Sequence, residues 1–291
     1  MPNPTRKRLE AAVKQAAATE GIAERRMRRW IAVIALIEIF SIARDAQRLP
    51  AFLIKGGLAL EFRFRARARS SRDVDFVFPM PKDALMDALI EALRIEWSGF
   101  RFSLKGVPED RGHSLRLVVN ASYQGCEWST FEVDLAQGSV DDSEFVTPYD
   151  LGAFGLMRPS TIPCLGVVEQ IAQKLHAVTS PREDRARDLL DVFLLDTCFA
   201  KNDQDLLAAI IRVFAERKTH PWPARIELRE TWRATLQQIL ARSGLEVGVD
   251  EIVDGVRAMI GRLEDTLHQD HRLDNGSAWM FSPAGITEDP V

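Results

Sequence analysis

Residues 51–135 combine short segments that alternate polar and apolar side chains with one segment that is amphipathic at the helical spacing. Alternation with a period of two is typical of a β-strand with one buried face, and apolar residues three and four positions apart are typical of a helix. The strand-like segments are Asp73–Phe78, Phe100–Val107, Leu115–Ser122 and Ser129–Leu135, and the helical segment is Lys82–Trp97. The pattern predicts an α/β core built from a small mixed sheet with helices.

The segments on both sides of this core have the helical period. Residues 5–47 predict two helices, and past Pro163 the strand signals stop. The helices expected after that point are Gly166–Thr179, Arg182–Phe199, Asp203–Arg217, Ile226–Ser243 and Asp250–His268, followed by a loose tail, 273–291, in which Trp279, Met280 and Phe281 are candidate anchors. We therefore predict an N-terminal helical extension in residues 1–50, a core in 51–165 and a helical C-terminal domain in 166–291.

Composition excludes several classes of protein. A chain of 291 residues that is 46% hydrophobic can bury a sizeable core, and a formal net charge of −4 excludes a globally basic nucleic-acid binder while permitting a local basic patch. The three cysteines are widely separated and form no CxxC pair, so neither a disulfide framework nor a zinc cluster is expected. The longest apolar run, Trp30–Phe40, contains Glu38 and is too short to span a bilayer. We expect a soluble, cytoplasmic protein with no membrane partner.

Two aspartates in the first strand-like segment are the strongest chemical signal. Because successive side chains of a strand alternate between faces, Asp73 and Asp75 share one face while Val74 and Phe76 point into the core. Two carboxylates side by side repel unless a cation lies between them, and Mg²⁺ prefers oxygen ligands of this kind together with substrate phosphates. A surface pair of aspartates with no ligand is the alternative interpretation.

A glycine pair precedes these aspartates. Gly56 and Gly57 interrupt an apolar run, and Leu58–Phe64 can form one or two helical turns. A backbone without side chains can approach a phosphate, and the free N–H groups at the start of a helix favour an anion there. The glycine turn and the aspartate pair together predict a site for a nucleotide phosphate and a metal ion.

A third carboxylate is expected if two metal ions assist a phosphoryl transfer, because the ion at the attacking oxygen needs a ligand of its own. Asp134 fits this role, since it lies in an alternating segment in which Glu132 and Asp134 share a face.

Two ordered blocks of the sequence resemble a known family. The first block comprises Lys55, Gly56, Gly57, Arg69, Ser71, Asp73, Asp75 and Phe76, and the second comprises Glu169–Ala177 with Lys174 and Arg185–Asp191 with Asp188. Both are similar to the signatures of the AbiEii/AbiGii-type nucleotidyltransferases, which are DNA polymerase β-like enzymes found mostly as toxins of toxin–antitoxin or phage-defence pairs. The interval from Gly57 to Asp73 is about one residue longer than the family pattern, and Leu58 stands where a small hydroxyl residue is common.

The resemblance implies a fold, a reaction and a set of site residues. It implies a polymerase-β-like core, with residues 166–291 completing the nucleotide site, and transfer of a nucleoside monophosphate from a nucleoside triphosphate (ATP, GTP or CTP) with two Mg²⁺ ions. The implied metal ligands are Asp73, Asp75 and Asp134, and the implied nucleotide-binding residues are Lys55, Gly56, Gly57, Arg69, Ser71, Arg72 and Lys174. Lys174 would neutralise the triphosphate, and Asp188 would orient Lys174 or the nucleotide.

The acceptor and the partners are open at this point. The 3′ end of tRNA is the first expectation and a protein serine, threonine or tyrosine the second, with a cognate antitoxin as partner. The alternatives are transfer to a small molecule and a nucleotide-binding regulator without turnover.

One of two arginine-rich segments could provide contacts for a phosphate-bearing acceptor. If the chain is extended, Arg63, Arg65, Arg67 and Arg69 line one edge and could contact phosphates. The cluster Arg25–Arg29 is expected to be a solvated helix face.

Overall fold

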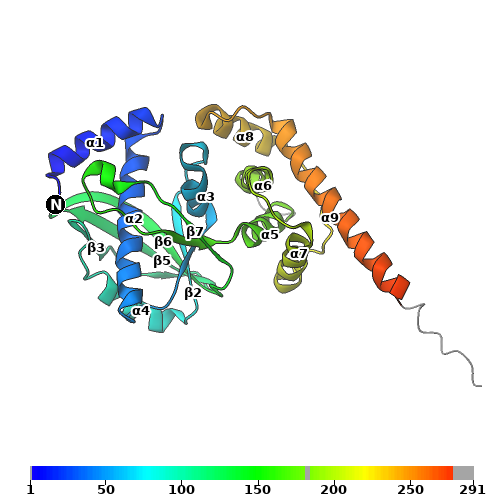
Figure 1. Ribbon diagram of the computed structural model, residues 1–291, viewed down its shortest axis with the longest axis horizontal. Helices are drawn as coiled ribbons and strands as arrows, with labels where there is room; N and C mark the ends of the chain where they lie inside the picture. The colour runs from blue at the N-terminus through cyan, green and yellow to red at the C-terminus, as the bar shows by residue number, and fades with distance from the viewer. Residues whose placement is uncertain (1, 181–183, 278–291) are drawn as a thin grey trace, which may run out of the picture. The chain divides into compact units, whose positions relative to one another are not determined.

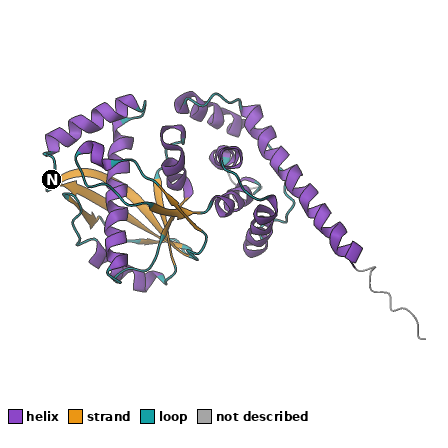
Figure 2. Cartoon of the chain, in the orientation of Figure 1, coloured by secondary structure: helices purple, strands orange, loops and turns teal. Residues whose placement is uncertain are grey.

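The computed structural model describes residues 2–180 and 184–277, with backbone only from 269 onward (Figure 1). Its α-helices are α1 (Arg6–Thr19), α2 (Glu24–Asp45), α3 (Gly56–Phe64), α4 (Lys82–Ala92), α5 (Val167–Val178), α6 (Ala186–Cys198), α7 (Asp203–Arg217), α8 (Glu230–Ser243) and α9 (Val249–Ser277). Its strands are β1 (Leu53–Lys55), β2 (Asp73–Phe78), β3 (Phe100–Leu104), β4 (Glu109–Asp110), β5 (Ser114–Tyr123), β6 (Cys126–Gln137), β7 (Ser143–Val146) and β8 (Ile162–Leu165). The mixed α/β class predicted from the sequence is therefore confirmed (Figure 2).

The strands form one mixed sheet in the order β3-β5-β6-β2-β1-β8-β7, with β4 paired to β5. β2 runs parallel to β6 and antiparallel to β1, so the strand with the two aspartates lies in the middle of the sheet. β5 and β6 form a long hairpin whose two turn residues, Gln124 and Gly125, both have positive φ. This is the geometry that matches the natural twist of a two-residue hairpin.

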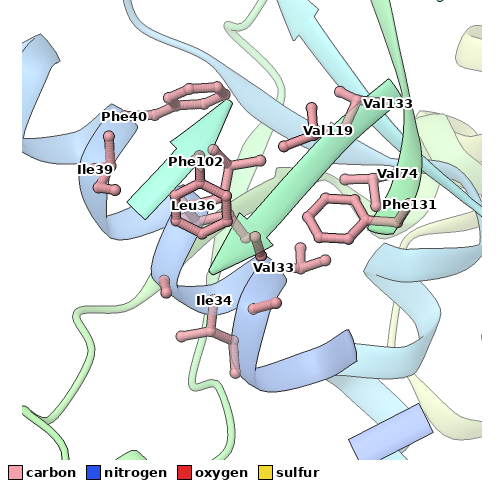
Figure 3. Close-up of a cluster of buried hydrophobic side chains, with 14 of the residues drawn as sticks. Val33, Ile34, Leu36, Ile39, Phe40, Val74, Phe102, Val119, Phe131 and Val133 are labelled. Carbon is pink, nitrogen blue, oxygen red and sulfur yellow. The ribbon is translucent and has the colours of Figure 1, made fainter. Parts of the chain in front are cut away.

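α2 packs its apolar residues against one face of the sheet. The segment Trp30–Phe40 is apolar on nearly every side, and a helix of that kind is stable only when it is buried. Figure 3 shows Val33, Leu36 and Phe40 of α2 among side chains of the strands, which include Val74, Phe102, Val119, Phe131 and Val133. Because these strand residues point toward α2, the residues between them, such as Asp73 and Asp75, point to the opposite face.

The described residues divide into two compact units. The sheet unit comprises residues up to Gln170 together with 238–246, and the helical unit comprises 171–237 together with the residues from Val247 onward. The first fifty residues are thus part of the sheet unit, because α2 supplies much of its core. In the helical unit, α7 begins with a cap in which the Asn202 side chain accepts hydrogen bonds from the N–H groups of Gln204 and Asp205.

Two expectations about the fold are wrong. The strands β7 and β8 were not expected, and β8 contains Pro163, which has no N–H to donate to the sheet. Residues 273–277, expected to be a loose tail, continue α9. Trp279, Met280 and Phe281 lie outside the described residues. No helix in the described part of the chain is both long enough and apolar enough to cross a membrane.

Candidate active site

Four carboxylates lie on the face of the sheet opposite α2. The parallel pairing of β2 with β6 places Asp73 beside Glu132 and Asp75 beside Asp134. The residues between them, Val74 and Val133 among others, are buried in the core, which confirms that the carboxylates share the other face. The third carboxylate therefore lies directly across from the second, on the neighbouring strand.

Arg116 of β5 binds this carboxylate group. It is the register partner of Asp134, and its Nε and Nη2 donate to the two Asp134 oxygens at 2.8 and 2.5 Å. Its Nη1 donates to Glu132 Oε2 at 2.7 Å, and Asp73 Oδ1 lies 3.6 Å from Nη2. Hydrogen bonding to Asp134, partly opposed by desolvation, raises the pKa of Arg116 above its usual value. Sequence reasoning missed Arg116, although the alternation of Ser114–Tyr123 places it between the buried Leu115 and Leu117.

The donor chemistry of this group suits a hard divalent cation, because carboxylate oxygens are the ligands that Mg²⁺ takes in proteins. Across residues 2–180 and 184–277, however, no three His, Cys, Asp or Glu side chains are gathered in a way that could hold a metal ion. Both oxygens of Asp134 accept hydrogen bonds from Arg116 instead. The expected ligands thus lie on one face of adjacent strands, in an arrangement held by a guanidinium.

The glycine pair forms the turn between β1 and α3, beside these carboxylates. Lys55 is the register partner of Asp75, and Gly56 has a φ of +67°, which only glycine adopts easily. A Cβ built at Gly56 would overlap the Asp75 carboxylate, so the backbone approaches that side chain closely. The turn therefore brings the start of α3 next to the Asp75 carboxylate.

The second glycine is contacted by residues of the loop before β2. A Cβ at Gly57 would lie 2.8 Å from Ser71 Oγ and 3.3 Å from Arg69 Nη1. Ser71 Oγ also donates to the Asp73 carbonyl at 3.1 Å. Leu58 is fully buried in the core and does not face this site. Gly57, Arg69 and Ser71, which are separated in the sequence, are thus neighbours.

A buried carboxylate holds this loop in place. The side chain of Glu61 in α3 is fully buried and accepts four hydrogen bonds, from Arg26 Nε, Arg29 Nη2, Trp30 Nε1 and the Ser71 N–H, at 2.6–2.8 Å. The Arg29 guanidinium also donates to the Arg72 carbonyl. The expectation that Arg25–Arg29 is a solvated helix face is therefore wrong for two of its arginines, because a buried glutamate from another helix pairs with them.

The arginine tract 63–69 is not extended. Arg63 belongs to α3, and its largely buried guanidinium contacts Glu144, Gln170 and the Leu165 carbonyl, so it is a structural residue. Residues 65–67 form a short 3-10 turn in which Arg65 and Arg67 are exposed. The expectation of four guanidiniums along one edge is wrong, because helix α3 continues through Phe64.

Lys174 and Asp188 lie in the helical unit. Lys174 Nζ on α5 donates to Asp188 Oδ1 and Asp191 Oδ2 on α6, each at 2.7 Å. All three side chains are buried or nearly so. Asp191 was not assigned a role from the sequence, although it lies one turn beyond Asp188 on the same helix. The other residues expected at the site, from Lys55 to Asp134, belong to the sheet unit.

The cysteines take no part in either group. Cys126, Cys164 and Cys198 are free, and burial raises the pKa of the Cys164 thiol to about 12, so this thiol stays protonated at neutral pH.

Comparison with known proteins identifies the family and the fold of the chain. The sequence profile of the family described as "Nucleotidyl transferase AbiEii toxin, Type IV TA system" matches residues 39–260. No curated protein matches the chain at a significant level. Among solved structures, the chain is similar to MenT4, a nucleotidyltransferase toxin from Mycobacterium tuberculosis, with a TM-score of 0.56 and 18% identity over 87% of this chain and 98% of that one. It is also similar to a protein from H. pylori provisionally described as a nucleotidyltransferase, with a TM-score of 0.50 and 15% identity over 85% and 98% of the two chains.

These similarities confirm the polymerase-β-like nucleotidyltransferase fold expected from the sequence. Because the profile covers most of the chain, including both sequence blocks, the chain belongs to the AbiEii nucleotidyltransferase toxin family and is an enzyme that transfers a nucleotide from a nucleoside triphosphate.

Proposed function

We propose that the enzyme transfers a nucleoside monophosphate to a hydroxyl group of RNA, with the 3′ end of a tRNA as the first candidate. The observation that carries the proposal is the register of β2 and β6, which sets Asp75 beside Asp134 and next to the Gly56 turn. In-line phosphoryl transfer depends mainly on positioning and on neutralising charge, and these groups can do both.

The reaction proceeds by attack of the acceptor oxygen on the α-phosphorus. As the new oxygen–phosphorus bond forms, the bond to pyrophosphate breaks, and Asp134 receives the hydroxyl proton. The backbone at Gly56 and Gly57 and the Ser71 hydroxyl bind phosphate oxygens, and Arg69 and Arg72 add positive charge near them. Asp73, Asp75 and Asp134 would hold the divalent metal ions, which offset the negative charge of the triphosphate when bound.

RNA is favoured as acceptor by the exposed guanidiniums of Arg65 and Arg67, which follow α3 directly. A chain of net charge −4 needs such a local patch to bind a phosphate backbone. The solved structure of MenT4 is that of a toxin, which supports the proposal that this enzyme is the toxin of a toxin–antitoxin pair.

The test is incubation with each of the four labelled nucleoside triphosphates, Mg²⁺ and total cellular RNA and protein. Label on RNA that disappears with Asp73→Ala supports the proposal. Label only on protein would move the acceptor to a side-chain hydroxyl, and label only on small molecules would favour a small-molecule nucleotidyltransferase. Bound nucleotide with no transfer to any fraction would favour a regulator.

Growth in a host that lacks a cognate antitoxin tests the toxin role. Expression of the wild-type chain should arrest growth, and expression of Asp73→Ala should not. Arrest by both proteins would show that the toxicity does not depend on nucleotide transfer.

A further inference from the structure

Arg116 binds Asp134 in the way that a metal ion would be expected to bind it. Of the contacts that the structure records for the guanidinium, two go to the two oxygens of Asp134, one goes to Glu132, and a longer one of 3.6 Å goes to Asp73. A forked contact to both oxygens of a carboxylate is among the strongest arrangements that arginine makes. Asp134 is therefore engaged before any cation arrives.

We propose that Arg116 is a positioning residue that holds Asp134 until a divalent cation binds and then remains paired with Glu132, so that it sets the affinity of the site for the metal. This inference rests on the proposed function, because it assigns Asp134 as a metal ligand. It concerns a residue that neither the sequence blocks nor the resemblance singled out.

Electrostatics explains why the face needs such a residue. Asp73, Asp75, Glu132 and Asp134 lie on adjacent strands in two register pairs, and uncompensated carboxylates at that spacing repel one another. A guanidinium cannot lose its charge at neutral pH, so Arg116 is a permanent counter-ion for this group. A divalent cation must displace part of that interaction, which weakens its apparent binding.

Arg116 can stay paired with Glu132 after it releases Asp134. Its carboxylate accepts from Nη1, while the contacts to Asp134 use Nε and Nη2, so the two carboxylates are held by different nitrogens. The Glu132 side chain is half exposed, and the Arg116 side chain retains 17% of its accessible surface. Release of Asp134 therefore requires a rotation of the guanidinium toward the more exposed Glu132.

The experiment measures Mn²⁺ binding to the full chain without nucleotide, from the electron paramagnetic resonance signal of free Mn²⁺. Removing the competing charge in Arg116→Gln should lower the Mn²⁺ dissociation constant roughly tenfold, because a unit charge a few ångströms from a divalent ion opposes its binding. Arg101→Gln is the matched control: Arg101 lies on β3 of the same sheet, is exposed and pairs with Glu96. It should bind Mn²⁺ as the wild type does.

The variant Arg116→Lys separates the effect of the forked contact on Mn²⁺ binding from the effect of the positive charge. Lysine keeps the positive charge but cannot bind both Asp134 oxygens in one plane, so this variant should bind Mn²⁺ more tightly than the wild type and less tightly than Arg116→Gln. Equal dissociation constants for wild type and Arg116→Lys would overturn the proposal, as would equal or weaker binding by Arg116→Gln. A thermal melt of each variant verifies folding.

The outcome also distinguishes this inference from the proposed function. Absence of Mn²⁺ binding in both wild type and Arg116→Gln overturns the inference. Tighter binding in Arg116→Gln that is lost on adding Asp134→Asn supports it, even if no acceptor is labelled, in which case only the proposed function fails.

Discussion

The sheet unit and the helical unit each contain a basic side chain bound to carboxylates, and the two groups differ in their exposure. Arg116 and Asp134 keep 17% and 16% of their side-chain surface, and their neighbours Asp73 and Glu132 are more exposed still. Lys174, Asp188 and Asp191 keep 9%, 14% and 2%. The difference lies in the outer members: Asp73 and Glu132 leave the group on the sheet partly open to solvent, whereas all three side chains on α5 and α6 are largely enclosed.

The difference in exposure separates two roles for the same kind of ion pair. An exposed pair contributes little to stability and can exchange partners, while a buried pair is costly to break because one charge is left without compensation. We therefore expect the carboxylates on the sheet to matter mainly for activity, and the lysine cluster to matter for the stability of the helical unit. The resemblance to the family assigns Lys174 to the triphosphate, a role for which it would have to share its charge with two carboxylates.

The largest expected effect concerns the aspartates on the sheet. Asp75→Asn should reduce the rate of nucleotide transfer by about a thousandfold, the scale of losing one preorganised electrostatic group, and should leave the melting temperature nearly unchanged. Asp110→Asn removes an exposed carboxylate of the same sheet and serves as the control. Retained activity in Asp75→Asn would show that the carboxylates on the sheet have no catalytic role.

The second prediction concerns the enclosed group. Lys174→Met keeps the length of the side chain but leaves Asp191 buried without its cation, so we expect a loss of roughly 3 kcal/mol in the free energy of unfolding measured with urea. Arg212→Met removes an exposed arginine of the same unit that pairs with Glu216, and it should cost less than about 1 kcal/mol.

Nucleotide affinity decides between the two roles of Lys174. If Lys174→Met unfolds as the wild type does but binds nucleotide more weakly, the enclosed lysine is a ligand-binding residue, as the resemblance implies. In that case Lys174→Arg should restore binding only in part, because a planar fork and a point charge differ in geometry.

Local patterns explain which parts of the fold could be predicted from the sequence. The strand Asp73–Phe78 and the helix Asp203–Arg217 have the bounds expected, because their periodicity is uninterrupted. The strand Ile162–Leu165 was missed, because four residues that include a proline do not show a period of two. The arginines 65 and 67 were placed on an extended edge, because alternation alone cannot show where a preceding helix ends.

The long-range contacts of the site could not be predicted in the same way. The alternation of β2 and β6 predicted that Asp73, Asp75 and Asp134 each lie on a polar face, but the register that pairs Asp75 with Asp134 depends on how the strands align. Arg116 belongs to no local motif, and it reaches the carboxylates only because β5 pairs with β6. Similarly, no short pattern connects Glu61 with Arg26 and Arg29, which come from a different helix.

The smallest expected effect concerns the exposed arginines that follow α3, and it tests whether this turn binds RNA. Arg65→Gln combined with Arg67→Gln should weaken RNA binding only a few-fold at low salt, because two phosphate contacts of many are lost, and should reduce the slope of log affinity against log salt by about 1.4 for single-stranded RNA. Nucleotide affinity should stay the same, since neither residue is assigned to the nucleotide. The control is Arg94→Gln, which neutralises an exposed arginine just after the end of α4. An equal change of slope in the control would mean that general charge, and not this turn, governs RNA binding, and the acceptor would then have to be sought among partners that do not depend on Arg65 and Arg67.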